Sequence, residues 1–502
     1  MILTPSAGAT LLQVVLWLPI VGSLIVALFA RRSDRAPFQI AFLVSLINLV
    51  LAFVLLSGFN RGDAGSFQFE TRLPWLPIPG FRSDYRIAVD GLSMPLVVLN
   101  AVLTFSAIAG SWHVQKRTAL YFSMFLALSS AIMGVFTAND LLLFFLFWEL
   151  ELVPMFLIIG IWGGARREYA AFKFILFTVA GSAFMLVGFL LLNIFGPRTF
   201  GIPEVAAYDF GRYGIGFTAF VFALLFVGFA VKVPVFPFHT WLPDAHVEAP
   251  TAGSVMLAGV LLKMGGYGLL RLTLWLVPEG AQFWQGTIVV LAVINAVYGG
   301  FIALSQTDLK KMIANSSISH MGYVLLGIAA MNQVGLQGAV LVMIAHGLYS
   351  GLLFSMVGLV YERTHTREIA QMTGLAQRMP VITALFFFAG LASLGLPGLA
   401  GFMAEFTTFI GAYGVFPLAT ILTVGTIALT AGYILWRLGS VFYGPLGESW
   451  TGLRDAMGRE RLAVGVLAAA TLLIGVFPNV IAEISAAGVA PIAGEVAKAA
   501  RK

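Results

Sequence analysis

Residues 215–239 read IGFTAFVFALLFVGFAVKVPVFPFH, a long apolar run that meets a lysine, Lys232, and then two prolines, Pro234 and Pro237. An apolar run of about 20 residues is long enough to cross a bilayer as a helix. Each proline removes one backbone hydrogen bond, so we expect the helix to break beside the lysine. Helices broken at membrane depth are typical of transporters. This stretch therefore predicts a membrane protein with a charge inside the bilayer.

The composition of the whole chain indicates the same class. Of the 502 residues, 59% are hydrophobic and only 10% are charged, which excludes a soluble globular protein of this size. Apolar runs of spanning length occur about fourteen times. Their approximate centres lie near Trp17, Leu46, Leu99, Leu126, Phe147, Leu186, Gly228, Leu261, Val290, Tyr323, Met343, Ala392, Ile427 and Leu472. No polar stretch between them is long enough to hold a separate catalytic domain.

The expected architecture is an all-α polytopic membrane protein with about 14 transmembrane helices in a single domain, residues 1–502. A second interrupted helix is expected in the later half, where Pro397 lies among glycines shortly before Glu405. Two interrupted helices at corresponding positions are typical of inverted-repeat transporters. We therefore expect two inverted repeats, approximately 115–280 and 281–445, with flanking helices at both ends.

Basic residues in the connections between helices set the expected orientation. They are scattered rather than clustered with aromatic residues, so the net charge of +6 does not indicate nucleic-acid binding. The odd-numbered connections are the richer ones and hold Arg31, Arg32, Arg35, Lys116, Arg117, Arg166, Arg167, Lys310, Lys311, Arg363, Arg367, Arg378, Arg454, Arg459 and Arg461. The positive-inside rule places these connections in the cytoplasm and both termini on the outer, periplasmic side. A bacterial inner membrane is favoured over an organellar one.

The sequence offers no residues for a redox centre. It contains no cysteine, so it cannot ligate an iron–sulfur cluster through thiolates, attach a c-type haem or form a disulfide. Its membrane histidines lack the His-x-x-His or carboxylate spacing of a metal site. We expect neither a metal nor a cofactor in this chain.

Four titratable side chains lie inside runs that otherwise resemble lipid-buried helices: Glu149, Lys232, Lys263 and Glu405. A charge at bilayer depth costs roughly 2.5 to 3.5 kcal/mol even on the lenient insertion scales. Such residues usually mark an ion or proton path for that reason. A lysine whose acidic partner moves can load and release a proton, whereas the alternative for Lys232 is a permanent structural ion pair.

A pair of acids occurs in the run 147–154, FWELELVP. Residues two apart point to different faces of a helix, so Glu149 and Glu151 cannot both look into one channel. Pro154 frees the carbonyl of Leu150 and weakens the helix just past the acid, which suits a hydrated polar pocket. We expect Glu149 to be the central acid, and Glu151 is a further candidate. The alternative is that both carboxylates reach water at a helix end.

Two histidines of the later half are candidates for proton relay. Ser316 and Ser317 share a helix face with His320, and Ser350 stands one turn beyond His346. Hydroxyl groups beside an imidazole make a wettable patch, and histidine exchanges protons near neutral pH. The alternative for each histidine is a hydrogen-bonded structural role.

The histidines of the stretch that follows Lys232 are less decisive. His246 and Glu248 are expected as loop residues at the cytoplasmic face, because loops hold such residues without a cost of burial. His239, directly after the two prolines, is a further candidate for proton transfer.

Residues 231–254, VKVPVFPFHTWLPDAHVEAPTAGS, with FWE at 147–149 and SSISHMG at 316–322, closely resemble the antiporter-like membrane subunits of respiratory complex I. The resemblance extends over nearly the whole chain. Within that family the chain is most similar to M-type subunits, the counterparts of mitochondrial subunit 4. The reason is Glu405, which stands where L and N chains and the multisubunit sodium/proton antiporters usually carry lysine. Nor does the C-terminus, after the span near Leu472, extend into the long lateral helix of an L chain.

The resemblance implies a proton-translocating subunit in the membrane arm of an NADH:quinone oxidoreductase. Flavin, iron–sulfur clusters and quinone would then belong to partner subunits, which include the sister L and N chains, and lipids would surround the helices. Carried onto matching positions, the proton path would use Glu149 with Lys232 as the input pair, Lys263 and His320 across the middle, His346 next and Glu405 at the outlet.

Two other functions remain open from the sequence. A subunit of a multisubunit sodium/proton antiporter would use the same fold and similar buried charges, although Glu405 argues against it. A passive membrane scaffold would instead place its charged helix faces at contacts with other subunits. The helices broken at Pro154, Pro234, Pro237 and Pro397 make the scaffold the least favoured of the three.

Overall fold

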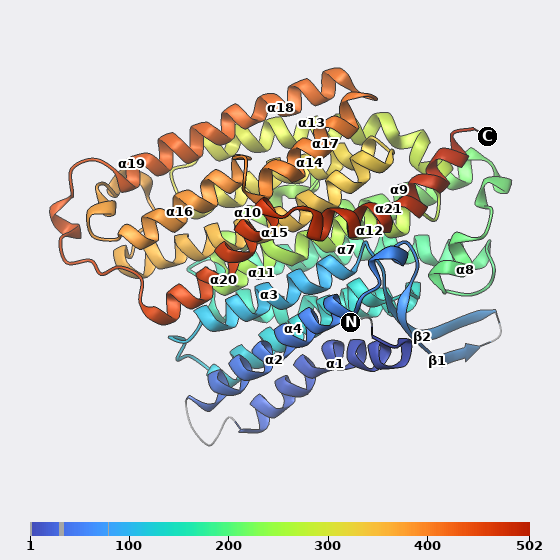
Figure 1. Cartoon of the computed structure of the whole chain (residues 1–502), viewed down its shortest axis with the longest axis horizontal. Helices are drawn as coiled ribbons and strands as arrows, with labels where there is room; N and C mark the ends of the chain where they lie inside the picture. Colours follow the sequence, from blue (N-terminus) through green and yellow to red (C-terminus); the bar gives the residue numbers. More distant parts are fainter. Residues whose placement is uncertain (1–2, 30–34, 79, 502) are drawn as a thin grey trace.

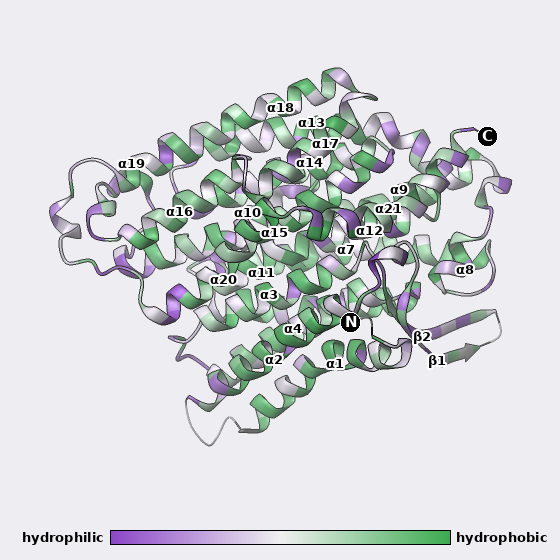
Figure 2. Ribbon diagram, in the orientation of Figure 1, coloured by the Kyte–Doolittle hydropathy of each residue, from purple (hydrophilic) through white to green (hydrophobic). Residues whose placement is uncertain are grey.

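The computed structural model describes residues 3–29, 35–78 and 80–501 and forms a bundle of helices with one β-hairpin (Figure 1). Arg31 and Arg32, used above for the orientation, lie outside these residues. Figure 2 shows hydrophobic residues covering the helices and hydrophilic residues gathered at helix ends, in loops and on the hairpin. This distribution is that of a protein surrounded by lipid. The predicted all-α membrane class is confirmed, with the hairpin as its exception.

Each of the fourteen expected span centres falls inside a helix, and eleven helical segments of the described chain are long and apolar enough to cross a membrane. The helices that hold these centres are α1 (Pro5–Phe29), α2 (Ala36–Gly58), α3 (Met94–Gly110), α4 (Thr118–Thr137), α5 (Leu141–Leu150), α7 (Arg167–Ile194), α9 (Ile215–Lys232), η4 (Leu257–Leu261), α13 (Pro278–Ser305), α14 (Leu309–Ala329), α15 (Gln333–Thr364), α16 (Pro380–Ser393), α18 (Pro417–Ala431) and α20 (Gly458–Val476). The remaining elements are η1 (Arg61–Asp63), β1 (Gln68–Ile78), β2 (Phe81–Val89), α6 (Leu152–Trp162), α8 (Ile202–Ala206), η2 (Phe210–Tyr213), η3 (Phe238–Thr240), α10 (Trp241–Glu248), α11 (Thr251–Met256), α12 (Leu262–Gly268), η5 (Leu269–Leu274), η6 (Ile369–Gln371), η7 (Leu375–Gln377), α17 (Ala400–Tyr413), η8 (Gly432–Leu438), α19 (Gly439–Phe442), η9 (Glu448–Trp450) and α21 (Asn479–Ala499).

The three predicted helix breaks are present. α9 ends at Lys232, and after the prolines the chain resumes as α10. Pro397 lies between α16 and α17, and the span that carries Pro154 is interrupted at Glu151, where α5 gives way to α6. Each break releases backbone groups from the helical ladder, so titratable side chains can lie next to them.

Two spans form the centre of the bundle. In the most apolar stretch of each helix, all residues of the span from Thr251 to Leu274 are buried and 94% of those of α15, against 33% for α2. The first of these spans alternates α-helix with two π-helical stretches, η4 and η5, on either side of α12. Irregular turns of this kind are frequent at functional sites. The most protected helices are therefore the ones that carry Lys263 and His346.

The C-terminal helix α21 was not expected from the sequence. It lies against the starts of α13 and α15, where the Gln337 side chain donates to the carbonyl of Ala482 over 3.0 Å. At Gly488 the backbone comes so close to the chain at Leu92 that an added Cβ would lie 2.2 Å from the Leu92 nitrogen. Only glycine permits this approach, so α21 is fastened to the segment that follows the hairpin.

One buried ion pair ties the base of the hairpin to the central bundle. Asp90, just after β2, accepts from the guanidinium of Arg271 in η5, and both side chains are less than 5% exposed. The guanidinium carbon also lies 5.2 Å from the ring centres of Phe67 and Trp275. Cation–π contacts of this kind favour a cation that has lost its water.

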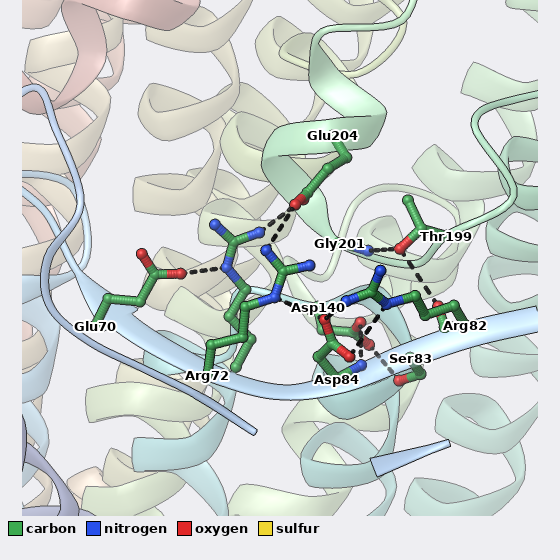
Figure 3. A network of polar contacts seen from close by, with 10 residues as sticks. Glu70, Arg72, Arg82, Ser83, Asp84, Asp140, Thr199, Gly201 and Glu204 are labelled. Atoms are coloured by element: carbon green, nitrogen blue, oxygen red, sulfur yellow. Dashed lines mark hydrogen bonds and ion pairs between the residues drawn. The ribbon is translucent and has the colours of Figure 1, made fainter. Parts of the chain in front are cut away.

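A polar network fixes the hairpin on the start of α5 (Figure 3). The guanidinium of Arg72 donates to Asp84 over 2.7 Å and pairs with Glu204 of α8 over 3.2 Å. Ser83 donates to Asp140 over 2.8 Å, and the Asp140 carboxylate also caps the first turn of α5. The hairpin is therefore connected directly to the helix that carries Glu149.

The hairpin network is expected to loosen in acid. Burial by itself raises the pKa of Asp84, but hydrogen bonds from Arg72 and Arg82 outweigh it and hold the pKa below its usual value of 3.8. A carboxyl with a lowered folded pKa stabilises the fold above its unfolded pKa and stops doing so as pH falls through the folded one. Hydrogen exchange of hairpin amides, corrected for intrinsic rates, should therefore be slower in the natural protein than in Asp84→Asn at pH 6.

In the same experiment the difference between the two proteins should shrink as pH falls through the folded pKa of Asp84, because both then carry an uncharged side chain at this position. A difference that stays constant over the whole acid range in which the hairpin remains folded would contradict the assigned role of the charge. The exposed acid Asp63 offers a matched control, since Asp63→Asn should leave the exchange rates of β1 and β2 unaltered.

Helix α18 has an unusual distribution of side chains. Its buried residues are threonines, namely Thr420, Thr423, Thr426 and Thr430. Its other faces expose Leu418 (71%) and Ile421 (58%). The Thr426 hydroxyl lies 2.7 Å from the Tyr323 hydroxyl, so the helix meets the bundle through hydroxyl groups.

Candidate functional site

The first part of the site is a buried ion pair at two helix breaks. Lys232, the last residue of α9, donates to Glu151 Oε1 in the interruption between α5 and α6, and the side chains are 1% and 0% exposed. The ammonium nitrogen also lies 5.5 Å from the ring centre of Trp148 and 5.1 Å from that of Phe174. The helix breaks thus bring together two opposite charges next to two aromatic rings.

The predicted partner of Lys232 was wrong. Glu149 was expected to form this pair, but the structure gives the contact to Glu151, and Glu149 is only half-buried. Acids two residues apart point to different sides of a helix, so only one of them can face Lys232. The Glu149 Oε1 atom is buried and has no hydrogen-bond partner among the described residues.

The second part of the site begins at Lys263 in α12. Its side chain is fully buried, and its Nζ lies 2.6 Å from Nδ1 of His346 in α15. The same nitrogen donates to the carbonyl of Ala258, five residues back in the π-helical stretch η4. The irregular backbone therefore offers Lys263 an acceptor that a regular α-helix would keep for itself.

From His346 the site continues to a second histidine and an acid. The ring centres of His346 and His320 are 5.7 Å apart. His320 Nδ1 lies 3.7 Å from Glu405 Oε1, and its Nε2 lies 3.0 Å from the hydroxyl of Ser393. All these side chains are at most 4% exposed. They form one buried row across the bundle.

The order of the two histidines in this row differs from the prediction. His346 contacts Lys263, and His320 lies next to Glu405, whereas the sequence-based path placed His320 before His346. The two residues come from different helices, α14 and α15, so the order in which they meet Lys263 depends on helix packing and cannot be read from chain order. We define this row as the central row: Lys263, His346, His320 and Glu405.

The break at Pro397 shapes the end of the central row. Gly395, in the turn between α16 and α17, has a φ of +79°, and a Cβ there would lie 2.7 Å from Glu405 Oε2. A glycine is required here both by the left-handed backbone and by the close approach of the carboxylate. The glycines around Pro397 thus make room for the acid.

Three other residues singled out in the sequence do not belong to the central row. His239 stacks on Phe236 and meets the ring of Tyr298 edge-on, at ring-centre distances of 5.6 and 5.3 Å, and no polar contact among the described residues joins it to the row. Ser316 and Ser317 donate to the carbonyl of Ile313 in their own helix. Hydroxyls within helices often bond to the backbone one turn back in this way.

The expectation that His246 is a loop residue was wrong. The break after Lys232 turns the chain back into the bundle as α10, so His246 is 0% exposed rather than solvated. Glu248 at the end of this helix is nearer the surface and accepts from the backbone nitrogen of Arg166 over 2.9 Å. This short helix contains no apolar run that would have predicted its burial.

Possible ligands for a metal ion are sparse. Within residues 3–29, 35–78 and 80–501 there is no group of three or more His, Cys, Asp or Glu side chains placed to hold one. The site consists of the Lys232–Glu151 ion pair and the central row. Their amines, imidazoles and carboxyls are groups that hold and pass protons.

Comparison with known proteins gives consistent results along the chain. Residues 138–430 match the family model described as NADH:quinone oxidoreductase/Mrp antiporter, transmembrane. A protein named NADH-quinone oxidoreductase subunit M, from Rhodobacter capsulatus, is 42% identical over 495 residues, which is 96% of either chain. A chain of respiratory complex I from Thermus thermophilus, solved with bound NADH, matches with a TM-score of 0.88 at 31% identity, over 97% of this chain and 99% of that one.

A more distant similarity concerns the fold alone. A chain of the Mrp complex from Dietzia sp. DQ12-45-1b matches with a TM-score of 0.86 over 99% of both chains, but at only 20% identity. From the matched family model and the relative at 42% identity it follows that this chain belongs to the NADH:quinone oxidoreductase/Mrp antiporter family of membrane proteins.

Proposed function

We propose that the chain is a proton-translocating membrane subunit of an NADH:quinone oxidoreductase. The observation that carries the proposal is the central row, in which an amine, two imidazoles and a carboxyl lie buried side by side within the bundle. Ionisable groups at this depth are costly and usually functional. The relative from Rhodobacter capsulatus, named NADH-quinone oxidoreductase subunit M, supports this complex over others.

The proposed mechanism uses a change in pairing at Lys232. While Glu151 holds the ammonium group, the positive charge is balanced. At 4 Å and an effective dielectric constant of 20, such a partner contributes about 4 kcal/mol of Coulomb energy. When the pair opens, the unbalanced positive charge of Lys232 repels the positive charge of Lys263. The Lys263 proton then passes to His346, on to His320 and finally to Glu405. Each histidine returns to its neutral form when it passes the proton on, and Lys263 returns to its charged form when it receives the next proton.

Electron transfer is assigned to other subunits. The chain has no cysteine, so iron–sulfur clusters would be held by partners rather than by this protein, and flavin and quinone are assigned to the same partners. The partners are the other membrane-arm subunits, including L-type and N-type sister chains, together with lipids. In this arrangement the chain converts a distant redox event into proton movement.

The internal symmetry and orientation belong to the same proposal. Two inverted repeats, approximately 115–280 and 281–445, are supported by one proline-broken helix in each, at Lys232 and at Pro397. The basic connections support a cytoplasmic position for the face that holds Arg166 and Lys310, and periplasmic termini. A bacterial inner membrane is supported by the bacterial relatives.

The proposal is tested by replacing Lys232 in the assembled complex. Lys232→Ala removes the charge that Glu151 balances, so proton uptake into vesicles during NADH-dependent quinone reduction is expected to fall about tenfold or more. The matched control is Lys498→Ala, because Lys498 is an exposed lysine near the C-terminus that pairs with its neighbour Glu495. It should leave both rates unchanged.

Two further variants separate the neighbouring acids. Glu151→Gln removes the negative charge that balances Lys232 and is expected to act like Lys232→Ala, whereas Glu149→Gln should have the smaller effect. Full proton uptake with intact quinone reduction in Lys232→Ala would refute the proposal. Sodium-dependent proton exchange without any NADH-linked partner would favour the antiporter function instead, although the Mrp similarity supports only the fold.

A further inference from the structure

A cavity of 620 Å³ lies between α17 and α18 and opens on the side of the bundle. α18 forms one edge of the bundle (Figure 1) and belongs to a segment that is long and apolar enough to cross a membrane. Three residues that line the cavity, Ile410, Tyr413 and Ile421, are 53%, 55% and 58% exposed. The opening of the cavity therefore faces the hydrocarbon of the bilayer.

The wall of this cavity is largely apolar and carries one acid. Phe402, Phe406 and Phe409 of α17 line it with aromatic rings. Among the lining residues that the structure describes, Glu405 is the only charged one, and its side chain is 6% exposed. Glu405 Oε1 has no hydrogen-bond partner in the described part of the chain. A buried polar group without a partner is costly, so this carboxyl is ready to accept from a ligand.

The helix break beside Pro397 keeps the carboxyl at the cavity wall. Gly395 also lines the cavity, and a Cβ at this residue would lie 2.7 Å from Glu405 Oε2. On the opposite side, Oε1 lies 3.7 Å from Nδ1 of His320, which is longer than a hydrogen bond. The carboxyl is thus fixed between a turn and an imidazole.

The chemistry of the wall selects one kind of occupant. The lining offers no basic residue that would balance an anion. A plain hydrocarbon chain would fill the space but leave the carboxyl without a hydrogen bond. A protonated amine donates to a carboxylate in a charge-assisted hydrogen bond, and phenylalanine rings nearby favour a cation further. The volume also lies within the range of about 300 to 1,000 Å³ that is usual for small-molecule sites.

We propose that this cavity binds a lipophilic amine, which is a protonated primary amine on a single hydrocarbon chain. The ammonium group donates to Glu405, and the chain lies against the phenylalanine rings and leaves past Ile421 into the bilayer. A bound amine occupies the carboxyl that ends the central row. The binding site itself does not depend on the proposed function.

The test is photolabelling of the assembled complex in lipid nanodiscs, with dodecylamine that carries a diazirine at the end of its chain. We expect the label on peptides of α17 and α18, and we expect dodecylamine to compete at least about tenfold better than dodecanol, because only the amine pairs with the acid. Glu405→Gln should lower the labelling by a similar factor. A diazirine-bearing dodecanol should label the natural protein and Glu405→Gln equally, which shows that the cavity is intact in the variant.

Two tryptophan variants test the position of the site. Ile421→Trp fills the cavity and should reduce labelling by the amine. Leu418→Trp adds the same ring to an exposed position of α18 that does not line the cavity, so it should be labelled like the natural protein.

Three outcomes would overturn the proposal. Equal competition by dodecanol and dodecylamine would make the cavity a groove for hydrocarbon chains alone. Unchanged labelling by the amine in Glu405→Gln would remove the acid from the site. No label on α17 or α18 of the assembled complex would mean that a neighbouring subunit occupies the cavity in place of an amine.

Discussion

Lys263→Met is expected to abolish proton translocation, with a loss of about 100-fold or more in coupled turnover. Lys263 is the first group of the central row, and its Nζ lies 2.6 Å from His346 Nδ1. Methionine has a similar volume and no proton to pass. The contacts of Lys263 are an imidazole and a backbone carbonyl rather than a carboxylate, so the substitution leaves no buried opposite charge unpaired and the complex should still assemble. Vesicle acidification and quinone reduction, measured together, check the result.

A second variant distinguishes charge from proton exchange at the same position. Lys263→Arg keeps a positive charge, but a guanidinium does not release its proton under any working condition. We therefore expect it to be as inactive as Lys263→Met. Normal translocation in Lys263→Arg would mean that Lys263 supplies only a fixed charge, and the relay through His346 would have to be abandoned.

Arg271→Met is expected to produce the largest loss of stability. It leaves Asp90 buried without its cation, and breaking a buried pair from one side costs about 3 to 5 kcal/mol. The thermal midpoint of the purified protein should fall and the yield of assembled complex with it. Since Asp90 also accepts from the backbone nitrogens of Leu92 and Ser93 at the start of α3, the disturbance should reach that helix.

The double variant Arg271→Met with Asp90→Asn is the matched control. Asparagine keeps an oxygen for the start of α3 and carries no charge, so most of the lost stability should return. If the single and double variants are equally unstable, the loss comes from the packing of Arg271 against Phe67 and Trp275 rather than from the stranded carboxylate.

Much of the fold was accessible from apolar runs and prolines alone. The lengths of the runs predicted the helices because backbone groups in lipid must bond within their own segment. The breaks at Pro234 and Pro397 followed from a missing backbone donor. The hairpin was missed because its strands contain Pro74 and Pro77, which a two-stranded ribbon with free edges tolerates. Helix α21 was missed because its alanine-rich sequence is less apolar than most of the other spans.

The sequence predicted which residues form the candidate site better than it predicted which of them touch one another. The cost of a buried charge singled out Lys232, Lys263 and Glu405 without knowledge of any neighbour. Which of Glu149 and Glu151 faces Lys232 depends on the rotation of α5 at its interruption, and no local pattern encodes that angle. The burial of His246 likewise depends on where α10 re-enters the bundle. The resemblance to membrane subunits of complex I is confirmed at the level of the family.

The threonine face of α18 has a consequence for how the protein depends on its surroundings. In a water-soluble helix the apolar side faces the core, but here Thr423 and Thr426 face inward and Leu418 and Ile421 face outward. A redesign that made only the outer side hydrophilic would leave a helix polar all round, with nothing to hold it on the bundle. The bilayer therefore acts as a folding partner for α18, because its apolar outer side is stable only against hydrocarbon.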